Sequence, residues 1–224
     1  MQFLLCLFVL IAVVRSSLYA IEETDFLVSA TIQLNHHRKM PRIGIGTAGL
    51  GGKDAAVVFQ ALSNGISMID TAQAREWYSE ERVGEGIGDY LFKNENAAKP
   101  FIVTKIHPRS FNRGKMYYAL SFSRRMLTNQ EDDILDVVLL HSPFCWPDHC
   151  SLEEETYTWQ EGWGNLEAFK AEGKLVANIG VSNFNIEQIK ELVEITNTKI
   201  SVIQNWCDPF HQDVEVRKFA ELNG

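Results

Sequence analysis

Five apolar segments of this sequence end in side chains that can bind a polar ligand or move a proton. These side chains are Asp70, Lys105, His141, the neighbours Ser182 and Asn183, and Gln204. A carboxylate, an ammonium group and an imidazole can hold or transfer a proton, and hydroxyl and amide groups can orient a ligand. Each residue alone has an ordinary structural interpretation, such as a solvated lysine or an aspartate that caps the next helix. Their recurrence at successive segment ends indicates one shared site.

Short β-branched segments alternate with segments of helical period, which predicts repeated strand–helix units and a parallel sheet. Asn64 with Gly65, and also Gly173, are typical of helix ends, and Asn185 with Gln188 is typical of a capping pair. The carboxyl ends of parallel strands meet on one face, so the polar side chains should converge there. We expect strands at 43–47, 67–71, 101–106, 136–141, 177–182 and 201–206, and helices near 53–63, 80–93, 114–128, 161–172, 186–195 and 213–222.

Glycines at 44, 46 and 49 form a G-x-G-x-x-G fingerprint between the first predicted strand and helix, and Asp70 follows about 20 residues later. Read alone, this fingerprint predicts a doubly wound dinucleotide-binding domain. A single fingerprint is a weak signal, and it leaves Lys105, His141 and the later polar strand ends unexplained. The doubly wound sheet is therefore the alternative fold.

Six blocks of the sequence together resemble the aldo-keto reductase family over roughly residues 30–224. They are Ile-Asp-Thr-Ala at 69–72, Glu-Arg-Val-Gly-Glu-Gly-Ile at 81–87, Phe-Ile-Val-Thr-Lys at 101–105, Leu-Leu-His-Ser-Pro at 139–143, Glu-Gly-Lys-Leu-Val-Ala-Asn-Ile-Gly-Val-Ser-Asn-Phe at 172–184, and Val-Ile-Gln-Asn at 202–205. The resemblance implies a parallel (β/α)8 TIM barrel, of which about six of eight units are present. It also implies reduction of a small aldehyde or ketone with NADPH, NADH being the alternative cofactor. The segment 30–41, around residues 35–37, is expected to form a hairpin at the bottom of the barrel.

The resemblance implies a catalytic set of aspartate, tyrosine, lysine and histidine, and three members match Asp70, Lys105 and His141. The tyrosine must donate a proton to the carbonyl oxygen, and an adjacent lysine cation should lower its pKa from the usual value near 10. Asp70 would keep the lysine charged and oriented. His141 would donate a hydrogen bond to the substrate oxygen and position it.

The position of the tyrosine departs from the family pattern. That pattern places it five residues after the aspartate, where this chain has Arg75, and the loop 73–79 looks about two residues longer than usual. Alignment backwards from Val83 places Trp77 there instead, beside Tyr78. Tyr78 is our candidate, because tryptophan has no proton to give at an accessible pKa. The alternative is that Tyr78 packs on the loop and the acid is lost.

The resemblance also assigns residues to ligand binding. Ser182, Asn183 and Gln204 would hold the nicotinamide carboxamide, while Gly46 and Thr47 match the first strand of the family's barrel. Aromatic side chains could form an apolar substrate wall, although they could equally pack within loops. The cofactor candidates are Gly46, Thr47, Ser182, Asn183 and Gln204, and the substrate candidates are Trp77 and Trp146, with Phe144 beside them.

The chain of 224 residues is 46% apolar and 22% charged, as expected for one globular domain. Its net charge of -8 comes without a basic stripe, which argues against nucleic acid as a partner. Cys145 and Cys150 lie close enough in one loop to form a disulfide, but three free thiols, with Cys207, are the favoured interpretation. No Cys-x-x-Cys pair is present, so no metal site is predicted.

Residues 1–20 have the pattern of a secretory signal peptide, since an apolar run at 3–14 is followed by Arg15 and small residues. Such a run is short for a membrane span. We therefore expect a mature domain at 21–224 in the secretory pathway, without a stable membrane partner after cleavage. An uncleaved anchor or a buried helix is the alternative.

The last predicted helix ends on Asn223 and Gly224, a typical helix end that should lead into another strand. In the family, loops after strands seven and eight hold the cofactor phosphates, and no match to them is found within these residues. We therefore expect a domain incomplete at its C-terminus, with open sheet edges that favour self-association. A catalytically impaired relic, acting as a binding or interaction protein, is the alternative to an enzyme.

Overall fold

The computed structural model describes residues 30–34, 38–128, 130, 132–146, 150 and 157–223. The expected signal peptide at 1–20 and the turn at 35–37 lie outside these residues. Within the described ranges, no helix is both long enough and apolar enough to cross a membrane.

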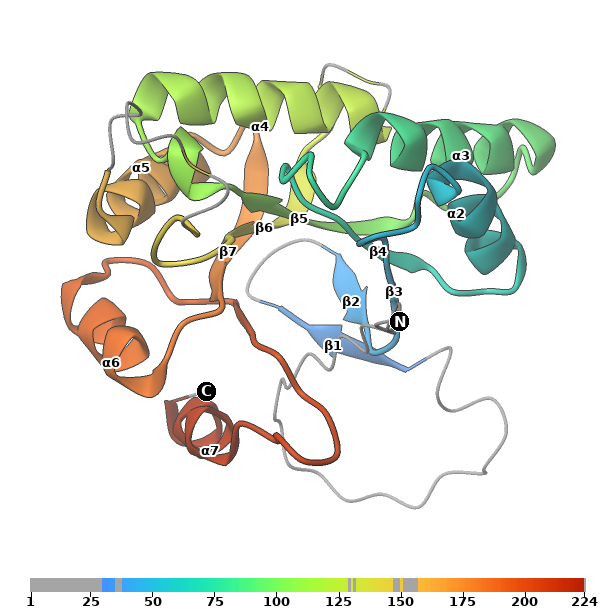
Figure 1. Ribbon diagram of the computed structural model, residues 1–224. Helices are drawn as coiled ribbons and strands as arrows, with labels where there is room; N and C mark the ends of the chain where they lie inside the picture. Colours follow the sequence, from blue (N-terminus) through green and yellow to red (C-terminus); the bar gives the residue numbers. More distant parts are fainter. Residues whose placement is uncertain are drawn as a thin grey trace.

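The centre of the fold is a six-stranded parallel sheet whose strands follow one another in chain order. The sheet curls into a half-barrel (Figure 1), and each strand pairs with its sequence neighbour. A doubly wound sheet would reverse its strand order at a switch point, so the alternative fold is wrong. The strands are β3 (Ile45–Gly46), β4 (Met68–Asp70), β5 (Phe101–Ile106), β6 (Leu135–Leu140), β7 (Val176–Ser182) and β8 (Val202–Gln204).

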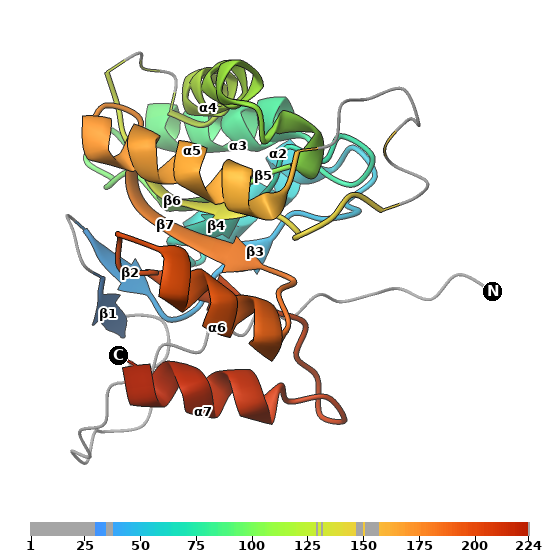
Figure 2. The same cartoon turned by 90° about the vertical axis from the view of Figure 1, so that its left-hand side faces the viewer.

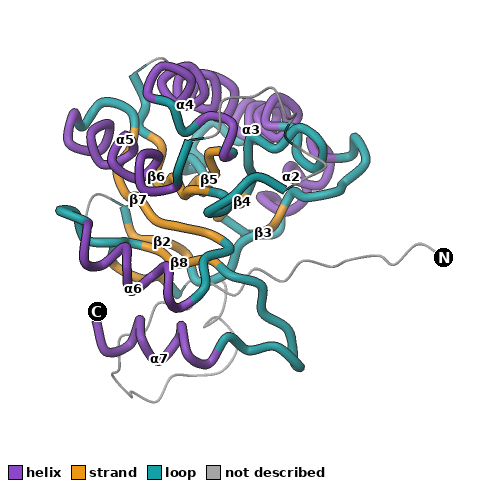
Figure 3. Tube along the Cα trace, turned by 60° about the vertical axis from the view of Figure 1, so that its left-hand side comes forward, coloured by secondary structure: helices purple, strands orange, loops and turns teal. Residues whose placement is uncertain are grey.

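Helices cover the outer, convex face of the sheet (Figures 1 and 2). Every predicted strand and helix is present, with ends that differ by a few residues. The short 3-10 helix η1 (Pro108–Ser110) was not predicted, and α6 and α7 lie side by side (Figure 3). The helices are α2 (Asp54–Ser63), α3 (Glu80–Lys93), α4 (Arg113–Thr128), α5 (Trp159–Glu172), α6 (Ile186–Ile195) and α7 (Val214–Asn223).

The helix ends confirm the local signals in the sequence. Asn185 and Gln188 form a reciprocal capping box at the start of α6. Helix α5 ends at Gly173, whose φ of 68° is the left-handed conformation that glycine adopts without strain. Gly173 thus returns the chain to the start of β7, and Asn185 begins α6 just beyond the carboxyl end of β7, near the rim.

A hairpin lies on the concave side of the sheet, as predicted. Its strands β1 (Thr31–Gln33) and β2 (Lys39–Pro41) pair antiparallel. Leu34 and Met40 pack against the inward-facing side chains of the sheet, whereas the alternate strand residues pack under the helices. The inner cluster is Leu34, Met40, Met68, Phe101, Val103, Val137, Leu139 and Val202.

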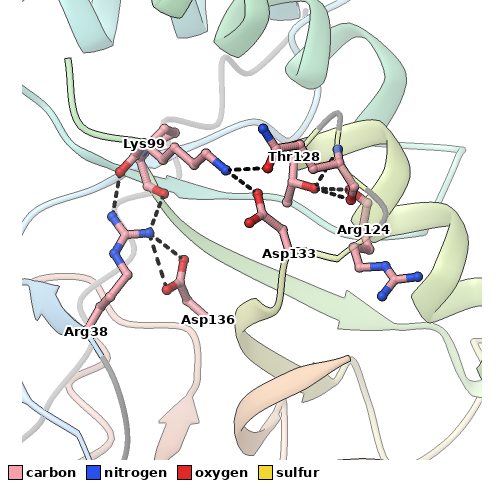
Figure 4. A network of polar contacts seen from close by, with 8 residues as sticks. Arg38, Lys99, Arg124, Thr128, Asp133 and Asp136 are labelled. Atoms are coloured by element: carbon pink, nitrogen blue, oxygen red, sulfur yellow. Dashed lines mark hydrogen bonds and ion pairs between the residues drawn. The ribbon is translucent and has the colours of Figure 1, made fainter. Parts of the chain in front are cut away.

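Polar contacts attach this hairpin to the amino-terminal ends of the strands (Figure 4). Arg38 donates to the backbone oxygen of Pro100 at 3.1 Å and pairs with Asp136 at 3.3 Å. Asp136 also accepts from the backbone N–H of Ile102 at 2.9 Å. These contacts hold the hairpin at the amino-terminal end, whereas the polar side chains predicted to form a site lie at the opposite, carboxyl-terminal rim.

Two of the outer helices approach each other closely at Gly84. A Cβ added to this residue of α3 would collide with the backbone oxygen of Met126 in α4. In α5, by contrast, a Cβ added to the exposed Gly164 would meet open space. The position of α3 matters for the site, because the loop that carries Tyr78 leads directly into this helix.

Candidate active site

The carboxyl-terminal rim brings together the polar side chains of β4, β5 and β8. Lys105 Nζ donates to Asp70 Oδ1 at 2.6 Å, and Gln204 Nε2 donates to Asp70 Oδ2 at 2.8 Å. The predicted convergence of these strand ends is confirmed. Asp70 therefore connects strands that lie far apart in the sequence.

The Lys105–Asp70 ion pair is almost completely buried, with 3% and 1% of the side chains exposed. Lys105 also donates to the backbone oxygen of Thr71 at 2.9 Å. Burial alone lowers the pKa of Lys105, but the negative charge of Asp70 opposes it, and the pKa is raised overall. The site therefore contains a permanent cation whose position is fixed by two oxygen partners.

Tyr78 is the aromatic residue of the β4–α3 loop that lies beside this cation. Lys105 Nζ is 5.3 Å from the centre of the Tyr78 ring, and the His141 ring centre is 5.9 Å from it. The backbone N–H groups of Tyr78 and Trp77 both donate to the oxygen of Ala74, at 2.9 Å each, which makes a tight turn. The turn brings Tyr78 to the buried end of Lys105.

Arg75 and Trp77, the two other positions considered for the tyrosine, have different surroundings in the structure. Trp77 is 59% exposed, and its backbone oxygen accepts from Gly49 at 2.7 Å. Arg75 lies over the ring of Phe122 at 5.4 Å and within 3.8 Å of Glu81. Of Arg75, Trp77 and Tyr78, the structure therefore brings Tyr78 to Lys105.

The pKa of Tyr78 is raised above its ordinary value of 10, mainly because the ring is buried. The charge of Lys105 and its hydrogen bond lower the pKa, but they do not outweigh burial. The expectation that Lys105 would bring this pKa below its usual value is therefore wrong in its net direction. At neutral pH the hydroxyl keeps its proton.

His141 directly follows β6 and is held neutral. Burial, followed by the charges of Lys105 and His107, brings its pKa well below 6.5. Its Nδ1 is a buried nitrogen with no hydrogen-bond partner among the described residues. Asn183 Nδ2 donates to the backbone oxygen of His141 at 2.7 Å, which fixes the segment. A neutral imidazole in this position can donate one hydrogen bond to a ligand.

The candidate cofactor residues line the rim next to this histidine. Asn183, whose φ is 59°, donates to Ser182 Oγ at 3.1 Å, and its backbone N–H donates to Gln204 at 3.1 Å. A carboxamide needs both donors and acceptors, and a hydroxyl with two amides offers both, so the nicotinamide end fits this donor set. Thr47 Oγ1 donates to the backbone oxygen of Asp70 at 3.0 Å and braces β3, whose last residue is Gly46, against β4.

Trp146 forms an aromatic wall beside the imidazole, with ring centres 5.6 Å apart. The ring centre of Phe144 lies 6.5 Å from that of Trp146. The ring of the buried His107 is centred 6.5 Å from that of Trp146 and 6.4 Å from that of His141. His107 was missed in the sequence, although a polar residue two positions beyond Lys105, just past the strand, was a usable signal. The rim thus has two histidines rather than one.

Cys145 and Cys150 form a disulfide next to this wall, with Cα atoms 6.0 Å apart. The favoured prediction of three free thiols is therefore wrong, because the loop brings two Cα atoms within bonding range. Cys207 is a free, half-buried cysteine. The disulfide encloses Trp146 in a short covalent loop.

A cavity of about 850 Å³ borders the site between the β4–α3 loop, η1 and α4. Tyr78 and His107 contribute to its wall, whereas Lys105 and His141 do not. Much of the remaining lining is cationic, although Arg109 is paired with Glu76 at 2.8 Å. No sequence signal predicted this cavity, because it forms only when the loop packs on α4.

Comparisons with known proteins agree with this geometry. The model of the aldo/keto reductase family matches residues 42–224. Aldo-keto reductase family 1 member A1 of Cricetulus griseus is 26% identical over 209 residues, and the Danio rerio member A1-A is 29% identical over 203 residues. These alignments cover 88% and 84% of this chain, which spans 63% and 60% of the relatives' lengths.

Solved structures show the same arrangement of strands and helices. A crystal structure of the Bombyx mori aldo-keto reductase in complex with NADP is 28% identical, with a TM-score of 0.65 over 77% of this chain and 56% of that one. An aldo/keto reductase from Brucella melitensis is 27% identical, with a TM-score of 0.69 over 85% of this chain and 67% of that one. The sheet, the buried lysine–aspartate pair and these matches lead to one conclusion: the chain belongs to the aldo/keto reductase family.

Proposed function

We propose that this protein reduces an aldehyde or ketone to an alcohol with NADPH, using Tyr78 as the general acid. The observation that carries the proposal is Tyr78 beside a buried cation: Lys105 Nζ lies 5.3 Å from its ring centre and 2.6 Å from Asp70. The relative from Bombyx mori, which was crystallised with NADP, supports the choice of cofactor.

The proton-transfer role follows from the environment of the tyrosine. Burial keeps the pKa of Tyr78 above 10, so the resting enzyme holds the proton that a carbonyl oxygen needs. As the proton leaves, negative charge develops on the phenol oxygen, and the fixed Lys105 cation stabilises it without reorganising. Asp70 prevents the lysine from moving towards solvent, since it is bonded to both Lys105 and Gln204.

The remaining residues would position the two reactants. Neutral His141 donates a hydrogen bond to the substrate oxygen and aligns it with Tyr78. Ser182, Asn183 and Gln204 hold the carboxamide of the nicotinamide, and Trp146, whose ring centre lies 5.6 Å from that of His141, bounds the substrate; the exposed Trp77 is left out of this wall. The bound cofactor supplies the hydride. Each step by this chain is therefore binding, orientation or transfer of one proton.

A non-catalytic interaction protein is the second candidate. Within the described residues, β3 and β8 each pair on one side only, which leaves two edges of the sheet available to a partner strand. This candidate requires no function from the Tyr78 hydroxyl. It predicts association with itself or with another chain, in the absence of any turnover.

Transfer of an isotope label separates the two candidates. Purified protein is incubated with an aromatic aldehyde and NADPH carrying deuterium at the reactive C4 position. The enzyme proposal predicts an alcohol that carries deuterium and a turnover rate that falls when the deuterated cofactor replaces the ordinary one. If no labelled alcohol forms while the folded protein binds NADPH, the reductase proposal is wrong.

A further inference from the structure

Three side chains of the kinds that bind soft metal ions lie together at the edge of the site. They are His107, which follows β5, and Cys145 and Cys150 from the loop after β6. Their ligand atoms all lie within 4.8 Å of one another. His107 is buried and the cysteines are half-buried, so the group sits in the wall of the rim.

We propose that the reduced form of this protein binds one thiophilic divalent ion, such as Zn²⁺, through Cys145, Cys150 and His107. The structure contains the oxidised form, in which the two cysteines are joined. A dithiol reductant supplies two electrons and two protons, becomes a disulfide itself, and leaves two thiols on the protein. The ion then displaces both thiol protons and binds two thiolates. This site is separate from the proposed proton donor and cofactor residues.

The geometry suits a tetrahedral ion. Zinc bonds of about 2.3 Å to sulfur and about 2.0 Å to nitrogen place ligand atoms roughly 3.5–3.8 Å apart. After reduction the two sulfurs, which are bonded in this structure, must separate to about 3.8 Å, and the imidazole nitrogen, now within 4.8 Å of them, must approach by up to about 1 Å. Four residues separate Cys145 from Cys150, which is within the usual spacing of paired zinc cysteines. A loop that allows a disulfide can also present both sulfurs to one point.

The charges of the ligands also favour a divalent ion bound by thiolates over a cation without negatively charged ligands. Two thiolates and a neutral imidazole cancel the charge of a divalent ion, so the complex is neutral and can be buried at low cost. Arg109, two residues from His107, is already paired with Glu76 at 2.8 Å, so that carboxylate is engaged and is not free to neutralise a bare cation. The charge of a divalent ion at this cluster would therefore be neutralised by the two thiolates themselves.

The histidine is already held in place for this role. Arg109 N donates to His107 Nδ1 at 3.3 Å, a long hydrogen bond, and the rings of Trp146 and His141 lie 6.5 Å and 6.4 Å away. The ion would bind through one ring nitrogen of His107, and an ion at Nδ1 would replace this long hydrogen bond. Three protein ligands leave a fourth position open to water or another ligand. The ion would thus sit next to the imidazole that is proposed to orient the substrate.

Cobalt binding tests the site without any activity measurement. The full chain is reduced with a phosphine, freed of metal by chelation, and titrated with Co²⁺ under anaerobic conditions. We expect one ion per chain, with thiolate-to-cobalt charge-transfer absorption and the visible bands of tetrahedral Co²⁺, both abolished by added Zn²⁺. The oxidised chain should give neither. Failure of the reduced chain to give these bands would overturn the proposal.

Variants then identify the ligands. Cys145→Ser and Cys150→Ser should each remove most of the charge-transfer absorption, and His107→Gln should weaken Co²⁺ binding at least tenfold, in keeping with loss of one ligand. Cys207→Ser is the matched control, because that thiol lies outside the cluster, and it should bind as the wild type does. Unchanged affinity in His107→Gln, or lost binding in Cys207→Ser, would contradict the assignment.

A measurement on the unmodified protein covers the case in which a variant does not fold. Reduced wild-type chain is alkylated with and without Zn²⁺, and each cysteine is followed by peptide mass spectrometry. Zn²⁺ should slow the modification of Cys145 and Cys150 together and leave Cys207 unaffected. Equal protection of all three thiols, or protection of none, would show that the cluster is not the binding site.

Discussion

Replacing Glu80 with glutamine tests whether burial of this acid, which has no role in the proposed mechanism, makes the stability of the protein depend on pH. Glu80 is the first residue of α3, and its side chain is buried under the site. Its oxygens accept from Thr104 Oγ1 at 2.5 Å and from Ser123 Oγ at 2.7 Å. Burial nevertheless outweighs both hydrogen bonds and raises the pKa from 4.5 to about 7.

The sign and size of the effect follow from this pKa. The folded chain holds the Glu80 proton more tightly than the unfolded chain does. The stabilisation contributed by protonated Glu80 is therefore fully present below about pH 4.5 and is lost as the pH rises to about 7. A difference of about 2.5 pKa units at 1.36 kcal/mol each amounts to about 3 kcal/mol. Glu80→Gln resembles the protonated acid in shape and does not ionise. Its free energy of unfolding should therefore exceed that of the wild type above pH 7 by up to about 3 kcal/mol.

Urea unfolding between pH 4.5 and 8 measures this difference. The wild type should lose stability across that range relative to Glu80→Gln, and the two curves should approach each other at the acidic end. Glu81→Gln is the matched control, because the neighbouring carboxylate is exposed, and it should follow the wild-type pH dependence. If Glu80→Gln keeps the wild-type pH dependence, the reasoning about this buried acid is refuted.

Three further predictions concern the ion pair, the helix contact and the N-terminus. Lys105→Met should lower the free energy of unfolding by about 3–5 kcal/mol in urea titrations, since it leaves Asp70 buried without its cation; a loss below 1 kcal/mol would argue against a buried charge. Gly84→Ala should cost about 1–3 kcal/mol because of the collision with Met126, whereas Gly164→Ala should raise stability by about 0.5–1 kcal/mol. Mass spectrometry of secreted protein should find a mature chain that begins near residue 21, and a cytosolic chain that retains Met1 would contradict the signal peptide.

The strands and helices could be predicted because their signals are local. The β-branched run at 101–106 and the capping pair of Asn185 and Gln188 act through neighbouring residues, and both elements form where expected. The meeting of Asp70, Lys105 and Gln204 was also predictable, because parallel strands carry their ends to one rim. The hairpin was recognisable from its alternation, and Leu34 and Met40 do enter the inner cluster.

The features that escaped prediction depend on packing between distant segments. The net direction of the pKa of Tyr78 is set by how deeply its ring is buried, which no local pattern reveals. The Cys145–Cys150 bond depends on the path of a loop, and the cluster with His107 joins residues that follow different strands. Because the β4–α3 loop is lengthened, the sequence alone did not decide which of Arg75, Trp77 and Tyr78 occupies the position of the catalytic tyrosine. In the structure, the turn at Ala74 brings Tyr78 beside Lys105.

The turnover of Tyr78→Phe tests the central proposal most directly. NADPH oxidation with an aromatic aldehyde is compared among the wild type, Tyr78→Phe, and Tyr118→Phe, a matched loss of one hydroxyl at an exposed position on α4. We predict that Tyr78→Phe loses about 100- to 10,000-fold in kcat while binding NADPH as before, and that Tyr118→Phe is unaffected. Wild-type turnover in Tyr78→Phe would show that another group donates the proton.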